Sequence, residues 1–182
     1  MEKFLECLRV EGYKYEIADR AVIVWSEFSP RLLTDDIVIP ENTNFMDGLD
    51  LGWVDVEIQL PEDLKVAYIM DLIGTNVTRL PSNLTIYDDC SVYLDVRKVK
   101  NVSYSANCGN NKRTIFAFWA NDDFLIAAGC FAGTYSRFER RVNEEYHDAT
   151  EALVYKRKAR GCISRLAKKL GKPNPFKRST AK

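Results

Sequence analysis

The chain has 182 residues, of which 46% are hydrophobic, 12% aromatic and 29% charged. This is the composition of a globular protein, and it excludes disorder of the whole chain. The 26 basic residues balance the 26 acidic ones, so the net charge alone selects no class of partner.

The charges are unevenly distributed along the chain. Residues 156–182 contain 11 basic residues and no acidic one, whereas residues 1–155 have a net charge of −11. The sequence therefore predicts an acidic body that carries a basic C-terminal segment. Opposite charges of this size also make self-association a possible outcome.

Neither the N-terminal residues nor the longest apolar runs predict a membrane protein. Residues 1–16 contain charges among the apolar residues, and no apolar run approaches the ~20 residues of a spanning helix. We therefore expect no membrane partner and a cytoplasmic location. The five cysteines are widely spaced without a Cys-x-x-Cys pair, which favours reduced thiols over disulfides.

The first 30 residues predict a helix followed by a hairpin. Phe4, Leu5 and Leu8 share one helical face over residues 2–11, and a glycine follows as a stop. Two strands over 13–17 and 21–25 then flank a short polar turn. We expect residues 1–30 to form an N-terminal cap.

Residues 31–105 contain a weak repeat with a period near 20. Pro40, Pro61 and Pro81 are each followed by an apolar-Asp-apolar core, and these cores are Leu49-Asp50-Leu51, Met70-Asp71-Leu72 and Leu94-Asp95-Val96. The first two cores lie at the same distance from their proline, and the third is displaced by four residues. A unit of this length supplies a short strand and a turn and must stack on its neighbours to bury its apolar face.

Residues 106–172 predict a hairpin and two helices. The hairpin strands span 114–119 and 124–129, and residues 129–134 are interpreted as a tight joint that enters a helix capped by Thr134. The second helix begins near Asp148 or Thr150 and ends at Gly171. Residues 173–182 are expected to be a basic tail, mobile from Asn174. The fold class is thus α+β, with a short repetitive β-sheet or solenoid in the middle.

Within these repeats, Leu60-Pro-x-x-Leu64-x-Val66 recurs as Leu80-Pro-x-x-Leu84-x-Ile86. This pattern resembles the short, irregular leucine-rich-like repeats of small bacterial and bacteriophage proteins. The segment 115–148 resembles the α+β module that closes such proteins. The resemblance covers roughly residues 37–160, and it implies a repeat fold with a surface for protein binding and no catalytic residue.

The sequence offers little catalytic chemistry. Cys130 and His147 are the available nucleophile and base, but Cys130 in its Ala-Ala-Gly-Cys-Phe context is interpreted as a structural thiol. Cysteine and histidine spacing matches no zinc site, and the glycine motifs of nucleotide-binding proteins are absent. We expect no enzyme, no metal and no cofactor.

The leading hypothesis is therefore a macromolecule-binding protein, for which the resemblance suggests a phage accessory protein that inhibits a host defence or transcription target. The alternative is a nucleic-acid-binding module that uses the basic helix and tail. The candidate acidic face consists of Asp50, Asp55, Glu57 and Asp71. The candidate basic face consists of Lys156, Arg157, Arg160, Arg165, Lys168, Lys169, Lys172, Lys177 and Arg178.

Overall fold

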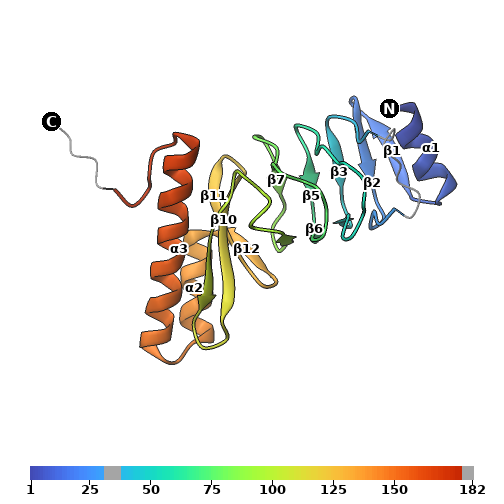
Figure 1. Ribbon diagram of the computed structural model, residues 1–182. Helices are drawn as coiled ribbons and strands as arrows, with labels where there is room; N and C mark the ends of the chain where they lie inside the picture. The colour runs from blue at the N-terminus through green and yellow to red at the C-terminus, as the bar shows by residue number, and fades with distance from the viewer. Residues whose placement is uncertain (31–37, 178–182) are drawn as a thin grey trace. The chain divides into compact units, whose positions relative to one another are not determined.

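The computed structural model describes residues 1–30 and 38–177, and the chain forms two units (Figure 1). The N-terminal unit contains Met1–Lys100 together with Ala120–Asp122, and the C-terminal unit contains Asn101–Trp119 and Asp123–Lys182. The mixed α+β architecture predicted from the sequence is confirmed.

Helix α1 (Glu2–Val10) and a hairpin open the N-terminal unit, as predicted. Phe4, Cys7 and Leu8 of α1 are buried, and the ring of Phe4 lies 5.6 Å from that of Phe28. The hairpin strands β1 (Tyr15–Ala18) and β2 (Ala21–Val24) are joined by two residues with positive φ. In Figure 1, α1 lies beside this hairpin at the N-terminal end of the stacked strands.

Two sheets form a short β-solenoid, in which strands of successive turns pair in parallel (Figure 1). The first sheet adds β3 (Thr43–Phe45), β5 (Lys65–Val66) and β7 (Thr85–Ile86) to the hairpin in the order β1-β2-β3-β5-β7. The second sheet contains β4 (Leu49–Asp50), β6 (Ile69–Leu72) and β8 (Ser91–Leu94). Each turn of the solenoid contributes one strand to each sheet. A strand of two to four residues cannot bury its apolar face alone, so the turns are stable only when they stack on one another.

Aligned apolar columns fill the interior of the solenoid. One column of buried side chains is in register between neighbouring strands, at intervals of 21, 21 and 20 residues, and consists of Val24, Phe45, Val66 and Ile86. The predicted period near 20 is therefore confirmed. Leu51, Leu72, Leu84 and Leu94 also point inward, with exposed fractions of 7% or less.

Two details of the predicted repeat are wrong. The stack begins before residue 31, because β2 pairs with β3 and Phe28 bridges to Leu49. In the last turn, Asp71 pairs with Tyr93 rather than Asp95. The link between β7 and β8, residues 87–90, is two residues longer than the link between β5 and β6, residues 67–68, and Asp95 lies just beyond the end of β8.

The exposed edge of β7 is closed by a side chain. Asn121 Oδ1 accepts a hydrogen bond from Ile86 N–H, and Asn121 Nδ2 donates to the Ile86 carbonyl, both at 2.8 Å. The backbone N–H of Asn121 also donates to the Leu84 carbonyl at 2.9 Å. An amide side chain reproduces the hydrogen bonds that another strand would make, so this edge is not left open.

The C-terminal unit contains a four-stranded antiparallel sheet rather than an isolated hairpin. The predicted strands are β10 (Arg113–Ala120) and β11 (Asp123–Ala128), and they are flanked by β9 (Ser103–Cys108) and β12 (Phe131–Thr134). The joint predicted over 129–134 is therefore wrong in part. Gly129 adopts a φ of +61°, which allows a tight turn after which the chain returns as β12.

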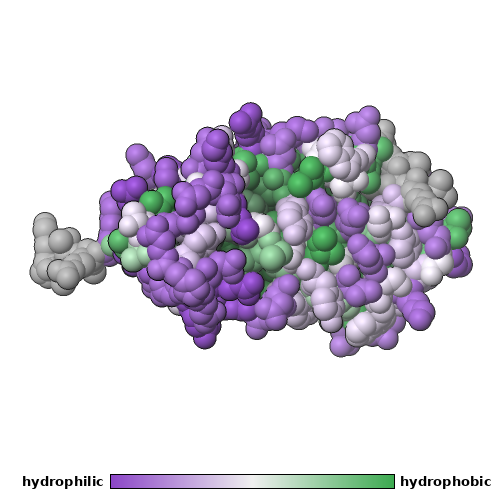
Figure 2. All heavy atoms as spheres, turned by 90° about the horizontal axis from the view of Figure 1, so that it is seen from below, coloured by the Kyte–Doolittle hydropathy of each residue, from purple (hydrophilic) through white to green (hydrophobic). Residues whose placement is uncertain are grey.

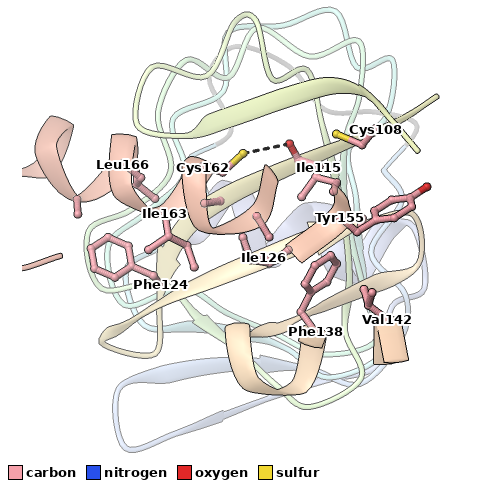
Figure 3. Packing of buried hydrophobic residues seen from close by; sticks show 14 of the residues in the cluster. Cys108, Ile115, Phe124, Ile126, Phe138, Val142, Tyr155, Cys162, Ile163 and Leu166 are labelled. Carbon is pink, nitrogen blue, oxygen red and sulfur yellow. Dashed lines mark hydrogen bonds between the residues drawn. The ribbon is translucent and has the colours of Figure 1, made fainter. Parts of the chain in front are cut away.

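Helices α2 (Tyr135–Glu145) and α3 (Ala149–Leu170) pack against this sheet. Thr134 and Asp148 are their N-caps, and Gly171 ends α3 in a left-handed conformation, all as predicted. The buried stripe of α3 meets side chains from β10, β11 and α2 in one apolar cluster (Figure 3). Cys162 lies inside it, with its thiol 3.7 Å from the Ile115 carbonyl.

The predicted mobile tail is wrong for residues 174–177, which the structure places against the helices. The ring of Phe176 lies 4.9 Å from the ring of Tyr135, and the Arg160 guanidinium lies 5.6 Å from Phe176. Asn174 Oδ1 accepts a hydrogen bond from Phe176 N–H and fixes the turn. The rest of the predicted tail, from Arg178 to Lys182, lies outside the described residues. Over 1–30 and 38–177, no helix has the length and apolarity needed to cross a membrane.

Candidate functional site

The predicted acidic residues Asp50 and Asp71 lie side by side on the second solenoid sheet. They are register partners on β4 and β6, and both are half-buried. Each carboxylate accepts a hydrogen bond from the backbone two residues ahead, from Gly52 N–H to Asp50 (2.9 Å) and from Ile73 N–H to Asp71 (2.8 Å). Both aspartates therefore stabilise the turns that leave their strands.

Trp53 follows Gly52, the residue that lies against these two carboxylates, and is 80% exposed. Its N–H donates to the Ile73 carbonyl at 2.9 Å, which places it beside Gly74 in the neighbouring turn. Its ring covers Gly74 so closely that a Cβ on this glycine would lie 2.7 Å from the Trp53 ring. A large aromatic side chain is thus held on the solenoid surface by its neighbour.

The backbone of Trp53 is strained. Its φ is +64°, and Gly74, its partner in the next turn, has a φ of +74°. Glycine adopts this conformation without a steric penalty, whereas a bulky residue there is an outlier. A solvent-exposed tryptophan in a backbone conformation that favours glycine contributes little to the stability of the fold. A role in binding explains its presence better.

Asp55 and Glu57, the other two predicted acidic residues, follow Trp53 on the same segment. Both are exposed, and neither makes a hydrogen bond or ion pair with any residue that the structure describes. We call Asp50, Trp53, Asp55, Glu57 and Asp71 the Trp53 patch. Sequence reasoning found its carboxylates and missed Trp53. The available signal was the 21-residue offset that aligns Trp53 with Gly74.

Four of the nine residues of the predicted basic face make intramolecular contacts. The Arg165 guanidinium donates to the Tyr104 carbonyl at 2.8 Å and to the hydroxyls of Ser103 and Ser105. Lys169 donates to the Val102 carbonyl at 2.7 Å. These two side chains cover the edge strand β9, whose outer backbone groups are otherwise open to pairing.

Two more of the predicted cations support the packing of the C-terminal unit. Arg160 pairs with Glu139 at 3.3 Å and donates to the Tyr135 hydroxyl at 2.8 Å. Lys172 lies 3.7 Å from the centre of the Trp119 ring, a cation–π contact. Arg160, Arg165, Lys169 and Lys172 therefore hold their own unit together.

The remaining predicted cations are more accessible. Arg157, Lys168 and Lys177 are exposed, Lys156 is half-buried, and Arg178 lies outside the described residues. Figure 2 shows that hydrophilic side chains dominate the visible face of this unit. The basic face is thus smaller than the count of lysines and arginines in the sequence indicates.

Cys130 and His147 are not brought together by a hydrogen bond. Cys130 is exposed in the turn between β11 and β12, and His147 is exposed between α2 and α3. The other four cysteines are buried and reduced, and burial raises the pKa of Cys7 to about 11 and that of Cys90 to about 12. In the described part of the chain, no group of three or more His, Cys, Asp and Glu side chains is placed to hold a metal ion.

No protein-family model matches the chain, and no curated protein or solved structure is found to be similar to it. The resemblance to leucine-rich-like repeats of bacterial and phage proteins therefore stays a prediction. The candidate site has to be judged on its own geometry.

Proposed function

We propose that the chain is a non-enzymatic binding protein that docks a basic segment of a protein partner on the Trp53 patch. The observation that carries the proposal is Trp53 itself, which is 80% exposed and held at a φ of +64°. Tryptophan is enriched among the residues that dominate binding energy at protein interfaces.

The chemistry of the patch favours a cationic partner. A lysine or arginine can lie on the face of the Trp53 ring, a contact worth ~0.5–2 kcal/mol depending on how far it is desolvated. The carboxylates of Asp55 and Glu57 are exposed and make no ion pair with a described residue, so they can pair with further cations. The solenoid unit has 20 acidic and 10 basic residues, which steers a basic partner toward it.

Nucleic-acid binding is the second candidate function, and the charge of the C-terminal unit favours it. This unit has 16 basic and 6 acidic residues. Four of the nine cations predicted to form the basic face are committed to β9, Glu139, Tyr135 and Trp119, as described above. Of the predicted cations on α3, only Lys156, Arg157 and Lys168 lie outside these contacts, and we rank this function second. A phage origin and a host target rest on the resemblance alone.

The test is capture of partners from a cell lysate by the immobilised chain, with and without nuclease. The test variant combines Trp53→Ser, Asp55→Lys and Glu57→Lys. The matched control combines Glu16→Lys and Glu41→Lys, which change exposed acidic residues elsewhere on the same unit.

We expect protein capture that resists nuclease, persists in the control and is lost in the Trp53 variant. Capture that disappears on nuclease treatment would support the nucleic-acid function instead. Equal capture by both variants would show that the Trp53 patch is not the binding surface.

A further inference from the structure

The C-terminal unit contains a pocket of about 150 Å³ that the proposed protein-binding function does not use. Its wall is formed by side chains from β10, from the β11–β12 turn and from both helices. A cavity of this volume in an apolar setting accommodates a ligand of about one aromatic ring. The pocket is therefore of the size for a small molecule and not for a peptide.

Two arginines from different elements face this pocket. Arg113 comes from β10 and Arg141 from α2, and neither forms an ion pair with a carboxylate in the described residues. Glu145 is the one carboxylate in the pocket wall, so the wall has a net charge of about +1. Guanidinium groups bind carboxylates through pairs of parallel hydrogen bonds, and a net charge of +1 matches a monoanion.

The rest of the wall is aromatic and apolar. Phe131 and Phe138 pack with ring centres 5.7 Å apart, and Tyr146 stacks on Tyr155 at 4.6 Å. An aromatic ring placed between these pairs would exchange water for favourable ring contacts. The pocket thus combines a cationic rim with an aromatic interior.

Tyr155 also lines the pocket, and its hydroxyl oxygen lies beside Gly109. Tyr155 is 2% exposed, and its hydroxyl, although close enough to the Tyr146 phenol to interact with it electrostatically, has no partner in hydrogen-bond geometry among the residues that the structure describes. In Figure 3 the oxygen of Tyr155 points away from the rest of the apolar cluster. Burial raises the pKa of the phenol, so the hydroxyl stays protonated and remains a donor. A buried donor without a partner is costly and calls for an explanation, which an oxygen of a bound ligand can supply.

We propose that this pocket binds a small aromatic monocarboxylate. The carboxylate lies between Arg113 and Arg141, and the ring lies against Phe131, Phe138 and the tyrosine pair. The Tyr155 hydroxyl is available to an oxygen of the ligand. A dianion such as a phosphate monoester is disfavoured because Glu145 adds a repulsive charge.

The experiment uses benzoate as the probe, with benzyl alcohol as the neutral analogue and phenyl phosphate as the dianion. Binding is followed by two-dimensional NMR of the full chain at fixed ionic strength. A second measurement is the rate at which iodoacetamide alkylates Cys130, the exposed thiol in the pocket wall. The variants are Arg113→Gln and Arg141→Gln, and the control is Arg140→Gln, which changes an exposed arginine of α2 outside the pocket wall.

We expect benzoate to bind with a Kd of about 0.1–1 mM, to shift amide signals of the pocket residues and to slow alkylation of Cys130. Each pocket-arginine variant should weaken binding about tenfold or more, while the Arg140 control binds as the unchanged chain does. The NMR spectrum of each variant shows whether its fold is retained.

Four outcomes overturn the proposal. The first is the absence of benzoate binding up to about 20 mM, which is too weak for a functional site. The second is equal binding of benzyl alcohol, which would remove the role of the carboxylate. The third is phenyl phosphate binding more tightly than benzoate. The fourth is benzoate binding that both arginine variants leave unchanged.

Discussion

At the scale of single residues, the solenoid is stabilised by polar side chains that form hydrogen bonds with backbone groups. Asn121 donates to and accepts from Ile86 and so closes the β7 edge. Asp50, Asp71 and Asp95 each accept a hydrogen bond from the backbone N–H two residues ahead, at the turn that follows them. Short side chains with oxygen acceptors are suited to this task because they reach nearby backbone groups without displacing them.

Replacing Asn121 by glycine should destabilise the protein by about 1–3 kcal/mol. The change removes both side-chain hydrogen bonds and leaves two backbone groups of Ile86 without their partners. Glycine is chosen because Asn121 has a φ of +55°, where alanine would add strain of its own. The measurement is urea unfolding followed by circular dichroism.

The matched control for this prediction is Asp122→Gly. Asp122 has nearly the same backbone conformation, with a φ of +53°, and is exposed. It should change the free energy of unfolding by only about 0.5 kcal/mol. Equal destabilisation by the two variants would mean that flexibility of the turn, and not the amide contacts of Asn121, determines the effect.

At the scale of elements, each strand of the solenoid depends on the neighbouring turns. The strands have two to four residues, too few for independent stability. Each packs its inward side chains on those of the adjacent turn. Leu72 of β6 is 1% exposed and pairs in register with Leu94 of β8. A cavity at this position therefore removes contacts from more than one turn of the solenoid.

We expect Leu72→Ala to lower the free energy of unfolding by about 2–5 kcal/mol. The control is Ile73→Ala at the next position, where the side chain is 38% exposed and its loss should cost about 1 kcal/mol or less. Thermal and urea unfolding of both variants provide the comparison. A similar loss of stability in the two variants would show that the inward and outward faces of this turn are wrongly assigned.

Some features of these elements could be predicted from the sequence and others could not. The helix caps at Thr134 and Asp148 were predictable because a side-chain oxygen before an amphipathic segment has a local cause. The displacement of the third apolar-Asp-apolar core is visible in the sequence, but the pairing of Asp71 with Tyr93 was not predictable, because strand register depends on the neighbouring turn and a weak sequence repeat does not fix it. Strand β12 was missed because Phe131–Thr134 is too short to display alternation.

In the candidate site, too, features with a local cause could be predicted and features that depend on distant residues could not. Its carboxylates were found because charge can be counted along the chain. The exposure of Trp53 was missed because an aromatic residue in a repeat usually lies in the core, and only the three-dimensional neighbour Gly74 shows otherwise. The loss of Arg160, Arg165, Lys169 and Lys172 from the basic face has the same cause, since their partners lie far away in the sequence.

At the scale of the whole molecule, the dominant feature is the separation of charge between two units. The N-terminal unit has a net charge of −10 and the C-terminal unit one of +10, although the chain as a whole is neutral. A neutral chain lacks the net repulsion that keeps many proteins monomeric. Each unit of one molecule is complementary in charge to the opposite unit of another, so head-to-tail association is the expected consequence.

We therefore expect the protein to self-associate at low salt and to dissociate as salt is added. The Debye length is about 30 Å at 0.01 M and about 10 Å at 0.1 M salt, so the attraction between units of different molecules is strong only in the dilute buffer. Sedimentation equilibrium should give a mass above 20.9 kDa at about 0.01 M salt and the monomer mass at about 0.3 M.

The double variant Arg157→Glu and Lys168→Glu tests the cause of this association. Both side chains are exposed, and the change lowers the charge of the C-terminal unit from +10 to +6. It should weaken association at low salt, whereas the charge-conserving control Arg157→Lys and Lys168→Arg should associate like the unchanged chain. A protein that stays monomeric at every salt concentration, or that associates more strongly as salt rises, would show that the opposite charges do not meet between molecules. In that case they remain available to the partners proposed for each unit.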